Sequence, residues 1–116
     1  MMSQITLAEA QQQVDHWIQT VGVRYFSELT NMAMLTEEVG ELSRLLIREY
    51  GEQSWKEGEK PRDVREGIAE ELADISFVVF CLADQCGIDL QDAFDRKLKL
   101  KTERDRDRHG QNTKLD

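Results

Sequence analysis

The chain has few residues that interrupt regular secondary structure, since its 116 residues include one proline and seven glycines. This scarcity excludes a turn-rich β fold and favours long, uninterrupted helices. No apolar run approaches the length of a bilayer span, which predicts a protein without a membrane partner. The residues from Met1 to Gln4 lack the basic-then-apolar order of a secretory signal, so we expect a cytoplasmic location.

Cysteine is also scarce. The two cysteines, Cys81 and Cys86, lie five residues apart in an apolar segment, a spacing that matches neither a CxxC motif nor a Cys/His zinc site. We expect both to be buried free thiols in a reducing compartment.

The chain lacks an excess of basic residues, because its net charge is −8. This argues against a nucleic-acid partner, which requires a basic surface. The charge is nevertheless uneven: residues 96–108 carry seven Lys or Arg and three acids, a net +4, which leaves −12 for the remainder. The basic segment is either a surface for a polyanion or an exposed, salt-bridged helix end.

Apolar residues recur at helical spacing in four segments, and strand-like alternation is absent from the sequence. The expected helices cover about residues 5–20, 27–50, 63–86 and 90–109. Thr6 with Glu9, Asp63 and Asp89 are the expected caps, and Gly22 and Gly87 the expected stops. We predict one all-α domain over residues 1–116, an antiparallel four-helix bundle-like fold with a flexible loop at about 51–62 and a frayed tail at 110–116.

The third expected helix is apolar on nearly every side between Ile75 and Leu82. A helix of this kind is buried on every side, which a small chain with three or four helices cannot achieve alone. We therefore expect oligomerisation to complete the core.

Three segments contain aromatic residues; the sequence predicts a location for one of them and leaves two alternatives for each of the others. Trp17 lies on an apolar helix face and is expected in the core. The Tyr25–Phe26 connection either packs onto the core or forms the floor of a base pocket. Trp55, within the charged loop, either packs back on the core or covers a ligand.

The most informative residues are two acidic blocks, Glu37–Glu38–Val39–Gly40–Glu41 and Glu70–Glu71–Leu72–Ala73–Asp74. Each block places carboxylates at positions i and i+3, which share one face of a helix. No Lys or Arg stands within residues 35–42 or 68–80 to neutralise them. An isolated pair of this kind is common on solvated helices, but two such pairs on neighbouring helices predict a site for a hard cation, Mg²⁺ or Mn²⁺.

These residues resemble a known family. The two blocks are similar to the EExxE and ExxD signature of the MazG-type nucleotide pyrophosphohydrolases, in the all-α NTP pyrophosphatase superfamily. The likeness extends over nearly the whole chain, including Tyr25–Phe26, residues 50–52 and residues 104–108, and is greatest to the short, single-domain members.

The resemblance implies a MazG fold, assembly as a homodimer or homotetramer, and hydrolysis of nucleoside triphosphates to monophosphate and pyrophosphate. It implies that Mg²⁺ is held by Glu38, Glu41, Glu71 and Asp74. Glu37 would orient the attacking water or serve a second metal. Lys97, Lys101 and Arg104 would contact phosphates, although the family pattern K…N…R lacks its Asn here, where Lys101 or Thr102 stands instead.

We therefore predict a Mg²⁺-dependent enzyme that hydrolyses canonical or damaged (d)NTPs, in keeping with nucleotide-pool cleaning. Trp55 is a further candidate substrate contact. The rival hypothesis is a non-catalytic helical oligomerisation or regulatory module that binds nucleotide or Mg²⁺ without turnover.

Overall fold

Four α-helices make up most of residues 4–116, the part of the chain that the computed structural model describes. They are α1 (Leu7–Thr20), α2 (Glu28–Tyr50), α3 (Val64–Gln85) and α4 (Leu90–Gly110), followed by a short 3-10 helix, η1 (Thr113–Leu115). The described residues contain no strand, so the prediction of an all-α fold with four helices is confirmed. Nowhere in residues 4–116 is a helix long and apolar enough to cross a membrane. The prediction that concerned Met1–Ser3 lies outside these residues.

The helix ends follow from residues with known capping preferences. The Thr6 hydroxyl accepts a hydrogen bond from the Glu9 backbone N–H at 3.0 Å, and the Glu9 carboxylate accepts one from the Thr6 N–H at 3.2 Å. At the starts of α3 and α4, the N-cap side chains of Asp63 and Asp89 each accept a hydrogen bond from the backbone N–H three residues later. Gly87 has a φ of 66°, a left-handed conformation that ends α3 without a steric penalty.

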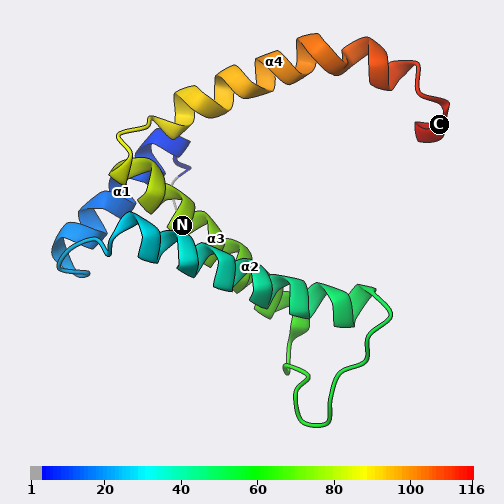
Figure 1. The fold of residues 1–116 in the computed structure, drawn as a ribbon, viewed down its shortest axis with the longest axis horizontal. Coiled ribbons are helices and arrows are strands. Elements are labelled where there is room, and N and C mark those ends of the chain that lie inside the picture. The colour runs from blue at the N-terminus through cyan, green and yellow to red at the C-terminus, as the bar shows by residue number, and fades with distance from the viewer. Residues whose placement is uncertain (1–3) are drawn as a thin grey trace.

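The helices α2 and α3 lie side by side and antiparallel, and α1 packs on the C-terminal part of α3 (Figure 1). In contrast, α4 contacts mainly α1 and then leads away from the helix pair (Figure 1). One chain by itself is therefore more open than a closed four-helix bundle. As a result, the apolar side chains of Phe94 and Leu98 on α4 are 53% and 55% exposed.

The core of a single chain is small. Its buried apolar residues are Ile18, Leu45, Val78, Cys81 and Ala83. Most of the apolar segment from Ile75 to Leu82 is only half-buried. On α2, Met32, Val39 and Leu46, which we call the α2 stripe, recur every seven residues and remain exposed. A spacing of seven keeps them on one helix face.

Two expectations about buried residues were wrong. Cys86 is exposed, because it is the C-cap of α3 and lies beyond the last packed turn, whereas Cys81 is buried. Burial, followed by the charges of Asp84 and Asp15, raises the pKa of the Cys81 thiol to about 11. Trp17 is not in the core but 46% exposed, since none of the residues from 4 to 116 covers its outer face.

Candidate metal centre

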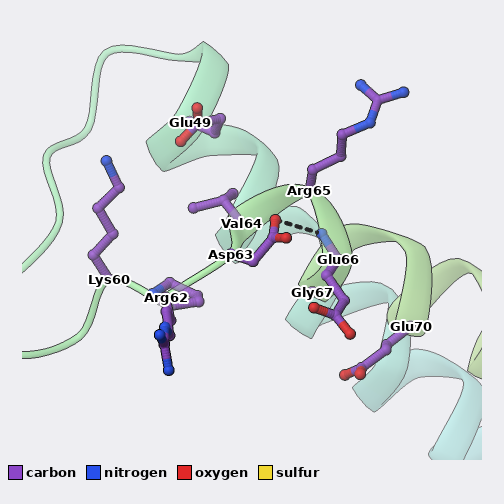
Figure 2. Close-up of a pocket in the computed structure, with 10 residues that line it drawn as sticks. Glu49, Lys60, Arg62, Asp63, Val64, Arg65, Glu66, Gly67 and Glu70 are labelled. Atoms are coloured by element: carbon purple, nitrogen blue, oxygen red, sulfur yellow. Dashed lines mark hydrogen bonds between the residues drawn. The ribbon is translucent and has the colours of Figure 1, made fainter.

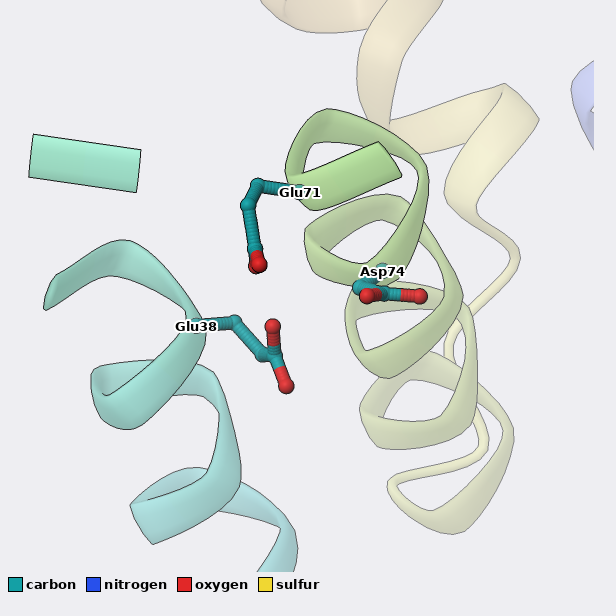
Figure 3. Close-up of side chains that lie close together, drawn as sticks. All are labelled: Glu38, Glu71 and Asp74. Atoms are coloured by element: carbon teal, nitrogen blue, oxygen red, sulfur yellow. The ribbon is translucent and has the colours of Figure 1, made fainter. Parts of the chain in front are cut away.

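Three carboxylates meet where α2 and α3 pack against each other. Glu38 extends from α2 toward Glu71 and Asp74 on α3 (Figure 3). One oxygen from each of the three side chains lies within 4.8 Å of the others. Glu71 and Asp74 share a face of α3 because they are three residues apart. We call these residues the carboxylate cluster.

The electrostatics of the carboxylate cluster are those of a site without a counter-charge. Glu71 is half-buried, and its Oε2 atom is inaccessible and has no hydrogen-bond partner. Hydrogen bonding with Glu38, followed by burial and by the charges of Glu38, Asp74 and Glu41, raises the pKa of Glu71 to about 7. None of the ion pairs within residues 4–116 involves the cluster. A divalent cation would relieve the repulsion, and the oxygen-only donor set fits Mg²⁺ or Mn²⁺.

The cluster contains three of the four carboxylates that the sequence pointed to. Glu41 is exposed and outside the group, although its charge still acts on Glu71. Glu37 is also exposed and outside it, because consecutive residues on a helix point in different directions.

The candidate phosphate contacts lie elsewhere in the chain. Lys97, Lys101 and Arg104 are exposed on α4, which leads away from α2 and α3 (Figure 1). The Arg104 guanidinium donates two hydrogen bonds to Asp105, at 3.0 and 2.9 Å, and this pairing lowers the pKa of the Asp105 carboxyl. Arg104 is therefore at least partly engaged in a helix-end ion pair, whereas the two lysines have no such partner among the described residues.

Trp55 packs back toward α2. Its indole is half-buried, and the Arg44 guanidinium carbon lies 5.7 Å from the ring centroid. Arg44 also forms an ion pair with Glu59 at 3.4 Å. Two residues of the loop, Trp55 and Glu59, therefore contact the same side chain of α2. Of the two roles considered for Trp55, this arrangement favours packing.

A second candidate site is a hollow away from the carboxylate cluster. It has a volume of about 930 Å³ and lies where the loop enters α3 (Figure 2). Its lining mixes Lys60, Arg62 and Arg65 with Glu49, Asp63, Glu66 and Glu70. Because the two signs of charge alternate, the hollow has no net preference for an anion or a cation, and the carboxylate cluster is the better candidate site.

The structure also gives two polar residues contacts that the sequence did not predict. Asn31 on α2 is a buried polar residue, 4% exposed. The Tyr25 hydroxyl lies 2.6 Å from an Asp15 carboxylate oxygen and 3.0 Å from one of Asp84, which anchors the connection between α1 and α2. The burial of Asn31 could have been predicted, because it lies four residues before Leu35 on the apolar face of the helix. The contacts of the Tyr25 hydroxyl could not, since its partners are 10 and 59 residues away in the sequence.

The raised pKa of Glu71 predicts how the stability of the metal-free protein depends on pH. Between about pH 4.5 and pH 7 the folded protein retains a proton on Glu71 that the unfolded chain has lost. Stability from this group therefore falls as pH rises through that window and is fully lost above it. In the presence of a chelator, we expect Glu71→Gln to melt at a higher temperature than the parent protein at pH 8 and at nearly the same temperature at pH 5. An equal effect of the substitution at both pH values would contradict the prediction.

Comparison with known proteins extends these observations. Residues 26–109 match the MazG nucleotide pyrophosphohydrolase domain. The chain is 40% identical over 107 residues to YpjD of Bacillus subtilis strain 168, an alignment covering 92% of this chain and 93% of YpjD. A crystal structure of B. subtilis YpjD superimposes with a TM-score of 0.70, over 84% of this chain and 96% of YpjD. The crystal structure of a Bacillus-conserved MazG protein, a nucleotide pyrophosphohydrolase, is 37% identical and gives a TM-score of 0.71, over 91% and 99% of the two chains.

Proposed function

Since the chain belongs to the MazG nucleotide pyrophosphohydrolase family, we propose that it hydrolyses nucleoside triphosphates to nucleoside monophosphates and pyrophosphate with Mg²⁺ or Mn²⁺ as cofactor. The observation that carries the proposal is the carboxylate cluster, three side chains that converge without a basic partner. A similar protein of known structure is a nucleotide pyrophosphohydrolase. We infer that the substrates are canonical or damaged (d)NTPs of the cytoplasmic pool.

The carboxylate cluster would hold the cation, with Glu41 as a fourth ligand from the adjacent turn of α2. When bound, a divalent cation supplies charge neutralisation for the phosphate oxygens. Glu38, Glu71 and Asp74 would set where the triphosphate lies, because they project from two helices that pack against each other. Glu71 must lose its proton when the cation binds, since a carboxylate ligand is ionised.

The reaction requires that a water oxygen form a bond to the α-phosphorus while the α–β bridging bond breaks. The bridging oxygen leaves with pyrophosphate, and the proton of the water passes to a base. Glu37 is exposed one residue before Glu38, and we infer that it orients this water or holds a second cation. Exposure suits that role, because a group that faces solvent exchanges protons freely.

We also propose that a second copy of the chain completes the site. The α2 stripe is 37–49% exposed in one chain, and no described large side chain is fully buried. Pairing of the stripe with a second copy would remove this apolar surface from water. Since α4 leads away from the helices that carry the cluster of its own chain (Figure 1), we infer that Lys97 and Lys101 serve the cluster of a neighbouring chain in a dimer or tetramer.

The role of α4 gives a kinetic prediction. Changing Lys97 and Lys101 to Ala should raise KM by roughly tenfold or more, the loss expected for charge-assisted hydrogen bonds to phosphate. The value of kcat and the affinity for Mg²⁺ should change little, because neither residue belongs to the cluster. Lys114→Ala, in the 3-10 helix, is the matched control. If KM stays the same, the lysines are no more than a solvated helix face.

The proposed activity is tested by incubating the protein with a panel of NTPs and dNTPs and Mg²⁺, then assaying pyrophosphate. We expect release with at least one nucleotide and none in the presence of chelator. Binding of metal or nucleotide without pyrophosphate from any member of the panel would instead support a non-catalytic regulatory module.

A further inference from the structure

The start of α4 is held by a side chain of α1. The Gln11 amide oxygen accepts a hydrogen bond from the Leu90 backbone N–H at 2.9 Å, and its Nε2 donates to the Ile88 carbonyl at 2.7 Å. Because a backbone N–H can only donate and a carbonyl can only accept, the two contacts use opposite ends of the amide and fix its orientation. Gln11 therefore bridges the residue that lies between them, Asp89.

Asp89 is the residue at which the chain turns from α3 into α4. The chain before it is fixed to α3, because the Ile88 N–H donates to the Ala83 carbonyl at 2.9 Å. Only φ and ψ of Asp89, at −81° and 103°, separate the Ile88 carbonyl from the Leu90 N–H, since peptide bonds are planar. These two dihedral angles set the direction in which α4 leaves α3, and the bridge made by Gln11 holds both of them.

The helix α4 holds the start of α1 in return. The Gln91 amide oxygen accepts a hydrogen bond from the Leu7 backbone N–H at 2.9 Å, and its Nε2 donates to the Asp95 carboxylate at 3.2 Å. Leu7 and Leu90 are the first residues of their helices, so their N–H groups have no acceptor within the helix. Each helix thus supplies the acceptor that the start of the other one lacks.

Little else in a single chain holds the direction of α4. It contacts mainly α1 and leads away from α2 and α3, and its apolar side chains Phe94 and Leu98 are exposed (Figure 1). With a rise of about 1.5 Å per residue, Lys101 lies about 16 Å along the helix from Leu90. A rotation of about 10° at Asp89 would displace it by about 3 Å, which is the length of a hydrogen bond.

We propose that Gln11 is a positioning residue for the reaction. By fixing φ and ψ of Asp89, it directs α4, and with it Lys97 and Lys101, to the triphosphate at the carboxylate cluster of a neighbouring chain. This inference rests on the proposed function, which assigns the two lysines to the phosphates. Gln11 acts through α4 and contacts neither the substrate nor the cation.

The kinetic test is a double-mutant cycle. Gln11→Met keeps the length of the side chain and removes both hydrogen bonds. It should raise KM about fivefold, the effect of about one net hydrogen bond, and leave kcat within about twofold of the parent value. When Lys97 and Lys101 are already Ala, the same substitution should change KM less than about twofold, because the side chains that it misplaces are absent. Equal fold changes in both backgrounds would overturn the proposal, since a general loss of stability does not depend on the lysines.

The direction of α4 can be measured without catalysis by electron paramagnetic resonance. Cys86→Ser removes the exposed thiol and leaves the buried Cys81. Spin labels are then attached at Ser43→Cys on α2 and Glu103→Cys on α4, two exposed positions. Mixing the labelled protein with an excess of unlabelled protein leaves one labelled chain in each assembly. We expect a narrow distribution of distances between the two labels, which Gln11→Met broadens.

Gln12→Met is the matched control, because it makes the same change at an exposed neighbouring residue of α1. It should alter neither the distances nor KM. If Gln11→Met does not fold, Gln91→Met tests the same connection from the side of α4, and the distribution should broaden there too. A distribution that stays narrow in the folded variant would overturn the proposal. Pyrophosphate release with unchanged distances would reject the positioning role alone, whereas broadened distances without pyrophosphate release even from the parent protein would reject the enzymatic function.

Discussion

Asn in place of Asp74, or Gln in place of Glu38, is expected to lower kcat by on the order of 10³-fold, because a catalytic cation contributes several kcal/mol of charge stabilisation. Each substitution removes one ionised ligand and keeps the size of the side chain. Isothermal titration should show a parallel loss of Mg²⁺ affinity. The metal-free variants should melt no lower than the parent protein, since each change removes a repulsive charge from the carboxylate cluster.

Glu70→Gln is the matched control for this experiment. Glu70 lies next to Glu71 on α3 and carries the same charge, but it is exposed and outside the cluster. We expect it to retain most of the activity and the Mg²⁺ affinity. Full activity in Asp74→Asn and Glu38→Gln would show that the cluster does not hold the catalytic cation.

The second large effect is expected from the α2 stripe. Introducing Lys at both Val39 and Leu46 should reduce the protein to a single chain of 13.5 kDa in light scattering. Burial of an unpaired ammonium group costs several kcal/mol, which corresponds to at least about 100-fold weaker association for each substitution. The rate of pyrophosphate formation should also fall when the assembly dissociates, because the α4 lysines of a neighbouring chain would no longer reach the cluster.

Leu115→Lys makes the same chemical change at a residue that is 63% exposed in the 3-10 helix. It should leave both the mass and the activity unchanged. If the doubly substituted protein kept the mass of the parent, the stripe would not be an interface. A single chain with full activity would show that the α4 lysines are not needed from a second copy.

Local features of the fold could be predicted from the sequence because short-range interactions determine them. The Thr6–Glu9 capping box and the left-handed Gly87 each depend on a few neighbouring residues. The helix boundaries follow from the same signals, together with an apolar spacing that only a helix satisfies.

The direction of α4 could not be predicted in this way. Its apolar residues Phe94 and Leu98 fit a helix that packs in a bundle, but they are exposed in the single chain. Helical periodicity indicates which face is apolar and carries no information on whether the same chain or another one covers it. Trp17 was misplaced for the same reason.

The candidate site was predictable to the extent that it depends on helical spacing. The i, i+3 rule correctly places Glu71 and Asp74 on one face, but it places Glu38 and Glu41 together equally well. Which of these two approaches α3 depends on how α2 is rotated in the packed pair, and there Glu38 is the closer one. The hydrogen bond that Asn31 Nδ2 donates to Gln85 Oε1 was not predictable, since the two residues are 54 positions apart in the sequence.

The central claim is that the cluster of Glu38, Glu71 and Asp74 supports metal-dependent cleavage between the α- and β-phosphates. The most direct test is phosphorus NMR of the products formed from one nucleoside triphosphate that the protein hydrolyses, with and without Mg²⁺. We predict equal amounts of nucleoside monophosphate and pyrophosphate, no diphosphate, and no reaction without the metal. Formation of nucleoside diphosphate and phosphate, or the same products in the presence of excess chelator, would contradict the claim.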